Sequence, residues 1–212
     1  IYTPLTCRRQ RQMCIRDRFL QLAARYNIQV AQPSTAAQYF HLLRRQILRK
    51  WRKPLIVFTP KSMLRNPGSA SQLEEFEEPR FLQVRGDLAA KNVDRVLVCT
   101  GKIGHELRKE RDARQKTGIA IISLEQLYPF PEDELRAELR RHSEAAEILW
   151  VQEEPANMGA LFFVYPRLQR LSDGRRVRSV KRSATGTPAT GSAKAHQVEQ
   201  QTLLTLAFAR IT

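Results

Sequence analysis

Cysteine is scarce in this sequence of 212 residues, which contains only Cys7, Cys14 and Cys99. No two of them form a C-x-x-C pair, so the sequence offers neither a disulfide framework nor a cysteine zinc site. A reducing compartment is the natural expectation. No apolar run approaches the roughly 18 residues of a membrane-spanning helix, and we therefore expect no membrane span.

Histidine and glycine are also few, with four and nine residues. No paired histidine or His-x-Glu pattern suggests a metal site, and no nucleophile stands at a defensible spacing from a base. The glycines form no dinucleotide fingerprint. Gly101-Lys102 follows a predicted strand as in a phosphate loop, but the spacing of the full motif is missing. We thus predict no catalytic, cofactor-binding or metal-binding residue in this chain.

Basic residues, in contrast, are in excess: 36 Lys and Arg face 21 Asp and Glu, which gives a formal net charge of +15. Such a balance suits nucleic acid or another anionic partner. The charge is spread over helical faces and loops, however, without the interleaved aromatic residues on which single-stranded bases stack. We do not expect nucleic-acid binding, although a freestanding basic module stays open as an alternative.

Residues 1–18 show neither helical nor strand periodicity and carry five arginines and one acid. Their end, RQRQMCIRDR, resembles translated vector or sequencing-adaptor sequence. We predict that this segment is a non-native, disordered leader and that the native chain begins near Phe19.

The segment that follows reads as a βαβ unit. Ser34 is the expected N-cap of its long helix, whose core face should consist of Tyr39, Leu42, Leu43 and Ile47. The unbroken apolar strand at its end is typical of a parallel sheet. The predicted elements are a helix over 19–26, a strand over 28–31, a helix over 35–50 and a strand over 55–58.

Lys61 and Arg65 lie on the loop after that last strand. Cations in such a position can meet a phosphate or a carboxylate, and a solvated turn is the alternative. Periodicity is then lost up to residue 91, with an Asn-Pro-Gly-Ser turn and a cluster of glutamates. We predict an interdomain linker over residues 67–90.

Beyond residue 91 the pattern predicts an α/β fold, with a mainly parallel sheet flanked by helices. The expected strands cover 95–99, 119–124, 148–151 and 177–180. The expected helices cover 104–116, 132–142, 161–171 and 194–209.

The stretch Ile148–Ala160 reads as a buried strand that stops at Gln152, an acidic turn and a capped helix. Glu153 and Glu154 stand at this turn, where open α/β sheets bind ligands, so they are acid–base candidates; two solvated glutamates are the alternative. Asn157 is the expected N-cap of the helix.

Five segments of this sequence resemble, in the same order, the carboxyl-terminal part of the thiamin-diphosphate-dependent 2-oxoglutarate dehydrogenase decarboxylase component. They are PSTAAQYFHLLRRQ (33–46), RKPLIVFTPKSMLRNP (52–67), ISLEQLYPFP (122–131), WVQEEPANMGA (150–160) and HQVEQQTLL (196–204). The resemblance implies that residues 19–66 are the end of a pyrimidine-binding domain and residues 91–212 a transketolase-type C-terminal domain. The equivalent part of a pyruvate dehydrogenase or transketolase is the alternative within the thiamin enzymes.

This resemblance implies that the full-length enzyme decarboxylates 2-oxoglutarate and transfers the succinyl group to lipoamide. It further implies bound thiamin diphosphate and Mg²⁺, a homodimer, a lipoamide succinyltransferase core as partner, and a bacterial cytoplasmic location. The diphosphate motif and the active-site histidines lie upstream of the matched segments. The chain alone is therefore expected to bind no cofactor and to be inactive, and Glu153, Glu154 and Asn157 are expected to shape a structural turn.

In multifunctional actinobacterial members of this family, the matching domain carries an acetyl-CoA activator site. The aligned positions of that site are Gln29, Arg45, Arg80, Gln83, Gln126, Asp133 and Glu134. Arg45 and Gln126 agree with it and Arg80 keeps the charge, whereas Asp133 and Glu134 replace basic residues. Two acids would repel a phosphorylated ligand. We accordingly predict an effector or phosphate site that is absent or altered, with Arg45, Arg80, Gln126, Lys61 and Arg65 as its candidates.

Overall fold

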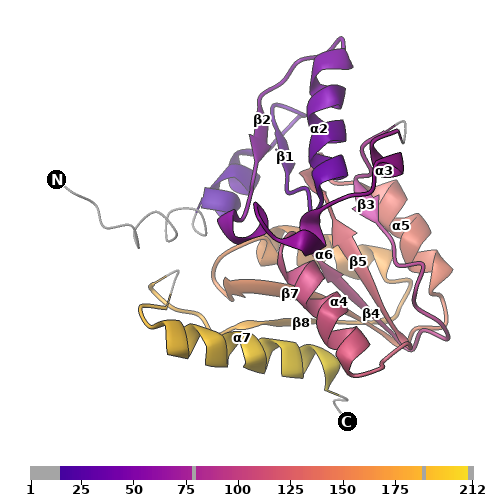
Figure 1. Cartoon of the computed structure of the whole chain (residues 1–212), viewed down its shortest axis with the longest axis vertical. Coiled ribbons are helices and arrows are strands. Elements are labelled where there is room, and N and C mark those ends of the chain that lie inside the picture. The colour runs from indigo at the N-terminus through magenta and orange to yellow at the C-terminus, as the bar shows by residue number, and fades with distance from the viewer. Residues whose placement is uncertain (1–14, 78–79, 188–189, 210–212) are drawn as a thin grey trace.

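The computed structural model describes residues 15–77, 80–187 and 190–209, which form two sheets with flanking helices (Figure 1). One sheet has three strands in the order β2-β1-β6, and the other has five in the order β3-β5-β4-β7-β8. The α/β fold class is confirmed, since all neighbours in the larger sheet are parallel except β3 and β5.

The smaller sheet contains the predicted βαβ unit. β1 (Gln29–Ala31) and β2 (Leu55–Val57) are parallel and are joined through helix α2 (Ala36–Leu48). Its third strand comes from the second half of the chain: β6 (Gln126–Tyr128) pairs antiparallel with β1. The two halves of the chain therefore share a sheet, which the sequence did not predict.

Helix α2 differs from its prediction at its cap and on its core face. Thr35, not Ser34, caps it by accepting from the backbone N–H of Gln38. Ser34 instead donates from its backbone N and its Oγ to the buried carboxylate of Glu125, each at 2.6 Å. Of the four predicted core residues only Leu42 is buried, and Tyr39, Leu43 and Ile47 are exposed.

The expectation of disorder over residues 1–18 is wrong for its last part, because residues 15–22 form a helix. Arg16 in its first turn is buried, and Phe19 packs edge-on against Phe58 with ring centroids 6.3 Å apart. The rest of the predicted leader, residues 1–14, lies outside the described residues.

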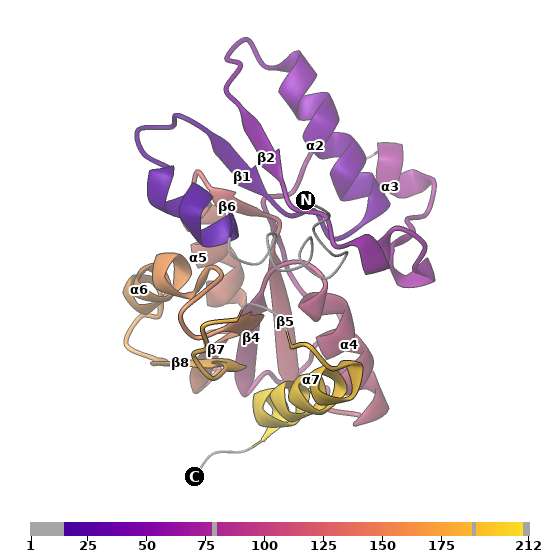
Figure 2. The same ribbon diagram turned by 90° about the vertical axis from the view of Figure 1, so that its left-hand side faces the viewer.

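The larger sheet is buried on both faces, because helices cover both sides (Figures 1 and 2). Alternate residues of its strands point to opposite sides: Val96 and Val98 face α5 and α6, whereas Leu97 and Cys99 face α4 and α7. Its strands are β4 (Arg95–Cys99), β5 (Ile119–Leu124), β7 (Glu147–Pro155) and β8 (Arg176–Arg182). Its helices are α4 (Ile103–Ala113), α5 (Glu132–Arg141), α6 (Leu161–Leu171) and α7 (Ala193–Phe208).

Residues 67–90, expected to be a linker, are built into the larger sheet instead. β3 (Val84–Arg85) pairs antiparallel with β5, and the short helix α3 (Glu74–Glu77) packs against α2. Asp87 is buried, forms an ion pair with Arg111 and accepts from the backbone N–H of Ile121 at 2.9 Å. Two short 3₁₀ turns, Lys61–Met63 and Pro67–Ser69, precede these elements.

The acidic stretch belongs to β7, not to a turn. β7 does not stop at Gln152 but runs on to Pro155, so Glu153 and Glu154 are strand residues. Asn157 does not cap α6, whose N-cap is Ala160. Its side chain instead bonds the backbone of Thr185 in both directions, at 3.0 and 3.1 Å, and thereby anchors the loop that follows β8.

Candidate functional site

A pocket of about 240 Å³ lies between the carboxyl-terminal half of α2 and the segment that precedes β3. Four arginines from these two segments line it together with one histidine and two apolar residues. They are His41, Arg44, Arg45, Leu48, Arg49, Arg80 and Phe81, and we name this site the arginine pocket. The structure therefore brings Arg45 and Arg80 together, as the resemblance implied.

Arg45 is partly buried at this site. Its guanidinium lies over the ring of Phe81, 4.4 Å from the centroid, and its Nη2 donates to Gln126 Oε1 at 2.6 Å. Burial and the neighbouring charge of Arg49 lower the pKa of Arg45 to about 10. Among the residues that the structure describes, no carboxylate forms an ion pair with Arg45 or Arg49. An anion in the pocket would relieve this uncompensated charge.

A chain of glutamine side chains sets the position of Arg45. Gln126 Nε2 donates to Gln83 Oε1 at 2.6 Å, and Gln83 Nε2 donates to Glu134 Oε1 at 2.8 Å. On the other side, Gln29 Oε1 accepts from Arg49 at 2.9 Å and from Arg45 at 3.4 Å. Five of the seven residues aligned with the actinobacterial site thus lie in one network, and Glu134 is linked to Arg45 only through two amides.

His41 places a ring nitrogen without a hydrogen-bond partner at the wall of the pocket, within the described ranges. The residue is 2% exposed, and its Nε2 lies 2.9 Å from the backbone oxygen of Glu75. Its buried Nδ1 has no hydrogen-bond partner within the described ranges. The sequence analysis did not include His41, Arg44 and Arg49 in the site. The spacing of four residues between His41, Arg45 and Arg49 could have indicated that these three share one face of a helix.

Lys61 and Arg65, the other two candidates, do not line the arginine pocket. Both are exposed, on the 3₁₀ turn after β2 and directly behind it. The structure therefore does not join them to the first three candidates, and their role stays a prediction.

Glu153 and Glu154 both hold elements together, but in different places. Glu153 pairs with Lys102 at 3.2 Å and accepts from Gln200 at 3.1 Å, which ties β7 to α4 and α7. Burial alone would lower the pKa of Lys102, but Glu153 and Glu106 raise it above its ordinary value. Glu154 forms a buried ion pair with Arg16 at 2.9 Å. These contacts give both carboxylates cationic or amide partners.

The crevice where open α/β sheets bind ligands is filled by side chains in this protein. Since β5 and β7 flank β4, the crevice lies outside the carboxyl ends of β4 and β7. The Lys102–Glu153 pair and Gln200 occupy it. Next to it, Gly101 has a φ of 72°, and a Cβ there would lie 2.0 Å from Gln32 Nε2. The smaller unit thus packs against the carboxyl edge of the larger sheet.

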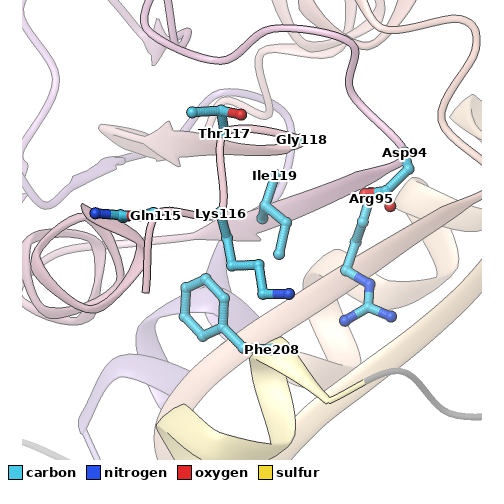
Figure 3. A pocket seen from close by; sticks show the side chains of 8 residues that line it. All are labelled: Asp94, Arg95, Gln115, Lys116, Thr117, Gly118, Ile119 and Phe208. Atoms are coloured by element: carbon cyan, nitrogen blue, oxygen red, sulfur yellow. The ribbon is translucent and has the colours of Figure 1, made fainter. Parts of the chain in front are cut away.

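A second pocket, of about 220 Å³, lies at the opposite edge of the sheet between the starts of β4 and β5 and the end of α7 (Figure 3). Figure 3 shows Lys116 beside the ring of Phe208, with Arg95 across from them. The guanidinium of Arg95 is already engaged, since it pairs with Glu147 at 2.5 Å and donates to the backbone oxygens of Ala207 and Ala209. Arg95 therefore holds the end of α7.

Within the described ranges, no three His, Cys, Asp or Glu side chains gather as a metal site would require. In the same part of the chain, every helix is too short or too polar to cross a bilayer.

Two family models match the chain one after the other. A model described as the transketolase pyrimidine binding domain matches residues 11–67, and one described as the 2-oxoglutarate dehydrogenase C-terminal matches residues 70–208. The chain belongs to the 2-oxoglutarate dehydrogenase C-terminal family. The second match begins at residue 70, which agrees with the place of β3 in the larger sheet.

Relatives of this family match along nearly the whole chain. The 2-oxoglutarate dehydrogenase E1 component of Cupriavidus necator is 45% identical over 92% of this chain and 21% of its own length. The E1/E2 component of Corynebacterium glutamicum is 42% identical over 91% of this chain and 16% of its own. The 2-oxoadipate dehydrogenase complex component E1 of Xenopus laevis is 42% identical over 89% of this chain and 22% of its own length. The chain thus spans about a fifth of the length of these curated relatives.

Proposed function

We propose that this chain is the carboxyl-terminal portion of a bacterial 2-oxoglutarate dehydrogenase E1 component. The complete enzyme decarboxylates 2-oxoglutarate and transfers the succinyl group to the lipoamide of a succinyltransferase core in the cytoplasm. The observation that carries the proposal is the tandem match of a pyrimidine-binding and a 2-oxoglutarate dehydrogenase C-terminal model, with 45% identity to such a component across the chain.

Thiamin diphosphate supplies the carbanion chemistry in this family. The described residues of this chain do not fit its diphosphate and Mg²⁺: no cluster of metal-ligating side chains is present among them, and the sheet crevice is filled by Lys102, Glu153 and Gln200. We infer that the rest of the enzyme binds the cofactor and that the chain alone is inactive. Its own contribution is structural, because it completes one sheet and forms part of a homodimer.

A chimera tests this proposal. Residues 15–209, which keep the first helix and Arg16, would replace the matching part of the Cupriavidus necator E1 component, and decarboxylation would be assayed with an artificial electron acceptor. Activity with 2-oxoglutarate is expected, together with NADH formation when the other components of the complex are added. A folded, dimeric chimera without decarboxylation would contradict the proposal. Because one relative is named for 2-oxoadipate, the same assay with that substrate tests the alternative.

The arginine pocket supports a second role as an effector site for an anion. Among the described residues, Arg45 and Arg49 have no ion-pair partner, and Arg80 lines the same pocket. Asp133 and Glu134 stand where the actinobacterial site has basic residues, and Glu134 is already bonded to Gln83. We propose an altered site that accepts a compact phosphate-bearing anion and binds acetyl-CoA more weakly than micromolar.

Calorimetric titration of the chimera with pyrophosphate, AMP and acetyl-CoA tests this role. Arg45→Gln and Arg80→Gln should each weaken the binding of pyrophosphate, whereas Arg140→Gln, at an exposed position of α5, should not. Micromolar affinity for acetyl-CoA would contradict the altered site. Lys61→Gln and Arg65→Gln in the same titration test the separate loop site.

A further inference from the structure

Ser34 joins the smaller unit to the larger sheet through all of its polar groups. Its backbone N–H and its Oγ donate to the two carboxylate oxygens of Glu125, each at 2.6 Å. Arg85 of β3 donates to the same Oγ at 2.8 Å, and Nε2 of His105 in α4 lies 2.7 Å from the backbone oxygen of Ser34. Ser34 is 6% exposed and Glu125 is fully buried. We name these four residues the Ser34 latch.

The Ser34 latch lies inside the fold of this chain. Three of its members come from β3, α4 and the connection between β5 and β6, whereas Ser34 directly precedes the N-cap of α2. Next to it, Gln32 donates from its backbone to the backbone oxygen of Glu125 at 2.8 Å, and its side chain accepts from Thr100 at 3.4 Å. A buried network therefore fixes the start of α2 to the larger sheet.

His105 closes the latch without needing a charge. A carbonyl oxygen carries no proton, so Nε2 of His105 is the donor in the bond to Ser34, and a neutral ring supplies that donor. A further proton would go to Nδ1, which lies 3.9 Å from the position that a Cβ on Gly68 would take, beside the turn Pro67–Ser69. No residue of that turn is ionisable. The closed latch thus uses the neutral form of the histidine.

Charged groups face the ring of His105 from α4 itself and from β3. Burial lowers the pKa of His105 below its ordinary value of 6.5. The hydrogen bond to Ser34 opposes this shift, the positive charges of Arg108 and Arg85 add to it, and Glu106 opposes it. A proton on His105 is therefore disfavoured while the latch is closed.

The carboxylate of Glu125 supplies the negative charge of the latch. Burial raises the pKa of Glu125 above its ordinary value of 4.5, while Arg85, the two bonds from Ser34 and Arg108 lower it. One buried carboxylate thus faces two arginines. A third cation at His105 would leave this cluster with an excess of positive charge, which weakens it.

The charge on His105 therefore controls how firmly the two units are joined. We propose that the Ser34 latch is an acid-sensitive joint, which is closed while His105 is neutral and loosens when His105 is protonated. In the open state the ring meets water and regains its ordinary pKa. The closed state then loses stability as the pH falls from about 6.5 through the lowered value. Glu125 contributes with the opposite sign, because its pKa is raised in the closed state.

Hydrogen exchange of the full 212-residue chain tests the latch. The protection factor of the Ser34 amide should fall several-fold from about pH 7.5 to about pH 5.5, whereas that of Leu97 within β4 should not fall in parallel. His105→Gln keeps a donor but cannot gain a charge, so its Ser34 amide should no longer lose protection. His196→Gln, on α7, is the matched control and should behave as the wild type. A constant protection factor in the wild type, or the same loss in His105→Gln, would overturn the proposal.

Charge variants test the cause of the pH dependence. The titration midpoint of His105, followed by the NMR signals of its ring, should lie below 6.5. Arg108→Gln should raise this midpoint and Glu106→Gln should lower it, because they remove charges of opposite sign. Arg140→Gln, exposed on α5, should not move it. Both measurements use the chain itself, so their outcome does not depend on the enzyme assignment. A midpoint at or above 6.5, or shifts of the two variants in the reverse directions, would contradict the acid-sensitive joint.

Discussion

Arg16 Nη1 lies 2.9 Å from Glu154 Oε1, and the two side chains are only 10% and 9% exposed. This ion pair joins the first described helix to the carboxyl end of β7. Arg16 also lies over the ring of Phe58, 5.3 Å from its centroid, so it contacts the end of β2 as well. One side chain from the predicted non-native leader thus connects three parts of the fold, and the pyrimidine-binding model, which matches from residue 11, includes it.

Replacing Arg16 tests how much this ion pair contributes to the stability of the fold. Arg16→Ala leaves a buried carboxylate without its cation, and removal of one partner of a buried pair typically costs about 3 kcal/mol. We expect a loss of that order in the free energy of unfolding, measured with urea. Arg18→Ala, at an exposed neighbour, should change it by less than about 0.5 kcal/mol. Equal effects of the two variants would show that the pair contributes nothing specific.

Asp87 tests whether the expected linker is part of the fold. Its carboxylate holds the buried Arg111 and the backbone N–H of Ile121. Asp87→Ala should therefore destabilise the chain by roughly 3 kcal/mol, because it leaves a buried guanidinium without its main partner. The control is Asp112→Ala, since Asp112 contacts the same arginine but its side chain is 70% exposed; about 0.5 kcal/mol is expected there. A linker would tolerate both changes.

Gln126 should matter for both stability and the arginine pocket. It is 2% exposed, accepts from Arg45 and donates to the backbone oxygen of Pro129 at 2.7 Å. Gln126→Ala removes the shorter of the two hydrogen bonds of Arg45 and leaves the oxygen of Pro129 without this donor. Such a loss typically costs about 2 kcal/mol, and it loosens Arg45. Pyrophosphate binding should weaken along with the free energy of unfolding. Gln201→Ala, exposed on α7, should alter neither, and unchanged binding in Gln126→Ala would contradict a positioning role.

Glu153 gives a prediction for pH. Burial raises the pKa of Glu153 above its ordinary value of 4.5, Lys102 opposes this shift and Glu106 adds to it. The folded state therefore binds the proton more tightly than the unfolded state, and stability falls as the pH rises from about 4.5 through the raised value. Glu153→Gln lacks this loss, so it should gain stability relative to the wild type as the pH rises through that window. Unfolding free energies across pH measure the difference, and Glu144→Gln, exposed on the surface, should run parallel to the wild type.

The buried strands were the most predictable part of the fold. β4 and β5 begin and end where the apolar runs 95–99 and 119–124 predicted, because both faces of the sheet exclude water and leave a continuous signal. Helices α5 and α7 were predicted to within a residue at each end. In these segments the local pattern and the tertiary environment agree.

The contacts between distant segments could not be read in the same way. The segment ISLEQLY reads as one continuous strand in the sequence. In the structure its second part is a separate strand, β6, because it pairs with β1. β3 has only two residues, which are too few to show the alternation of apolar and polar residues that indicates a strand. For the arginine pocket the resemblance supplied Arg45 and Arg80, and it also supplied Gln126, which bonds Arg45. That Arg45 and Arg80 line one pocket depends on the path of the chain between α2 and β3, which periodicity does not determine.

The pairing of β6 with β1 has a consequence for how this protein can be divided. The family models meet between residues 67 and 70, which suggests two inherited modules. β1 nevertheless lies between β2 and β6, so cutting the chain there would leave its inner strand with an open edge. The boundary between the two family models therefore does not separate two independently folding units. We expect both halves to melt in one cooperative transition, and an exchange of genetic modules at this seam to require β6 to move with the first half.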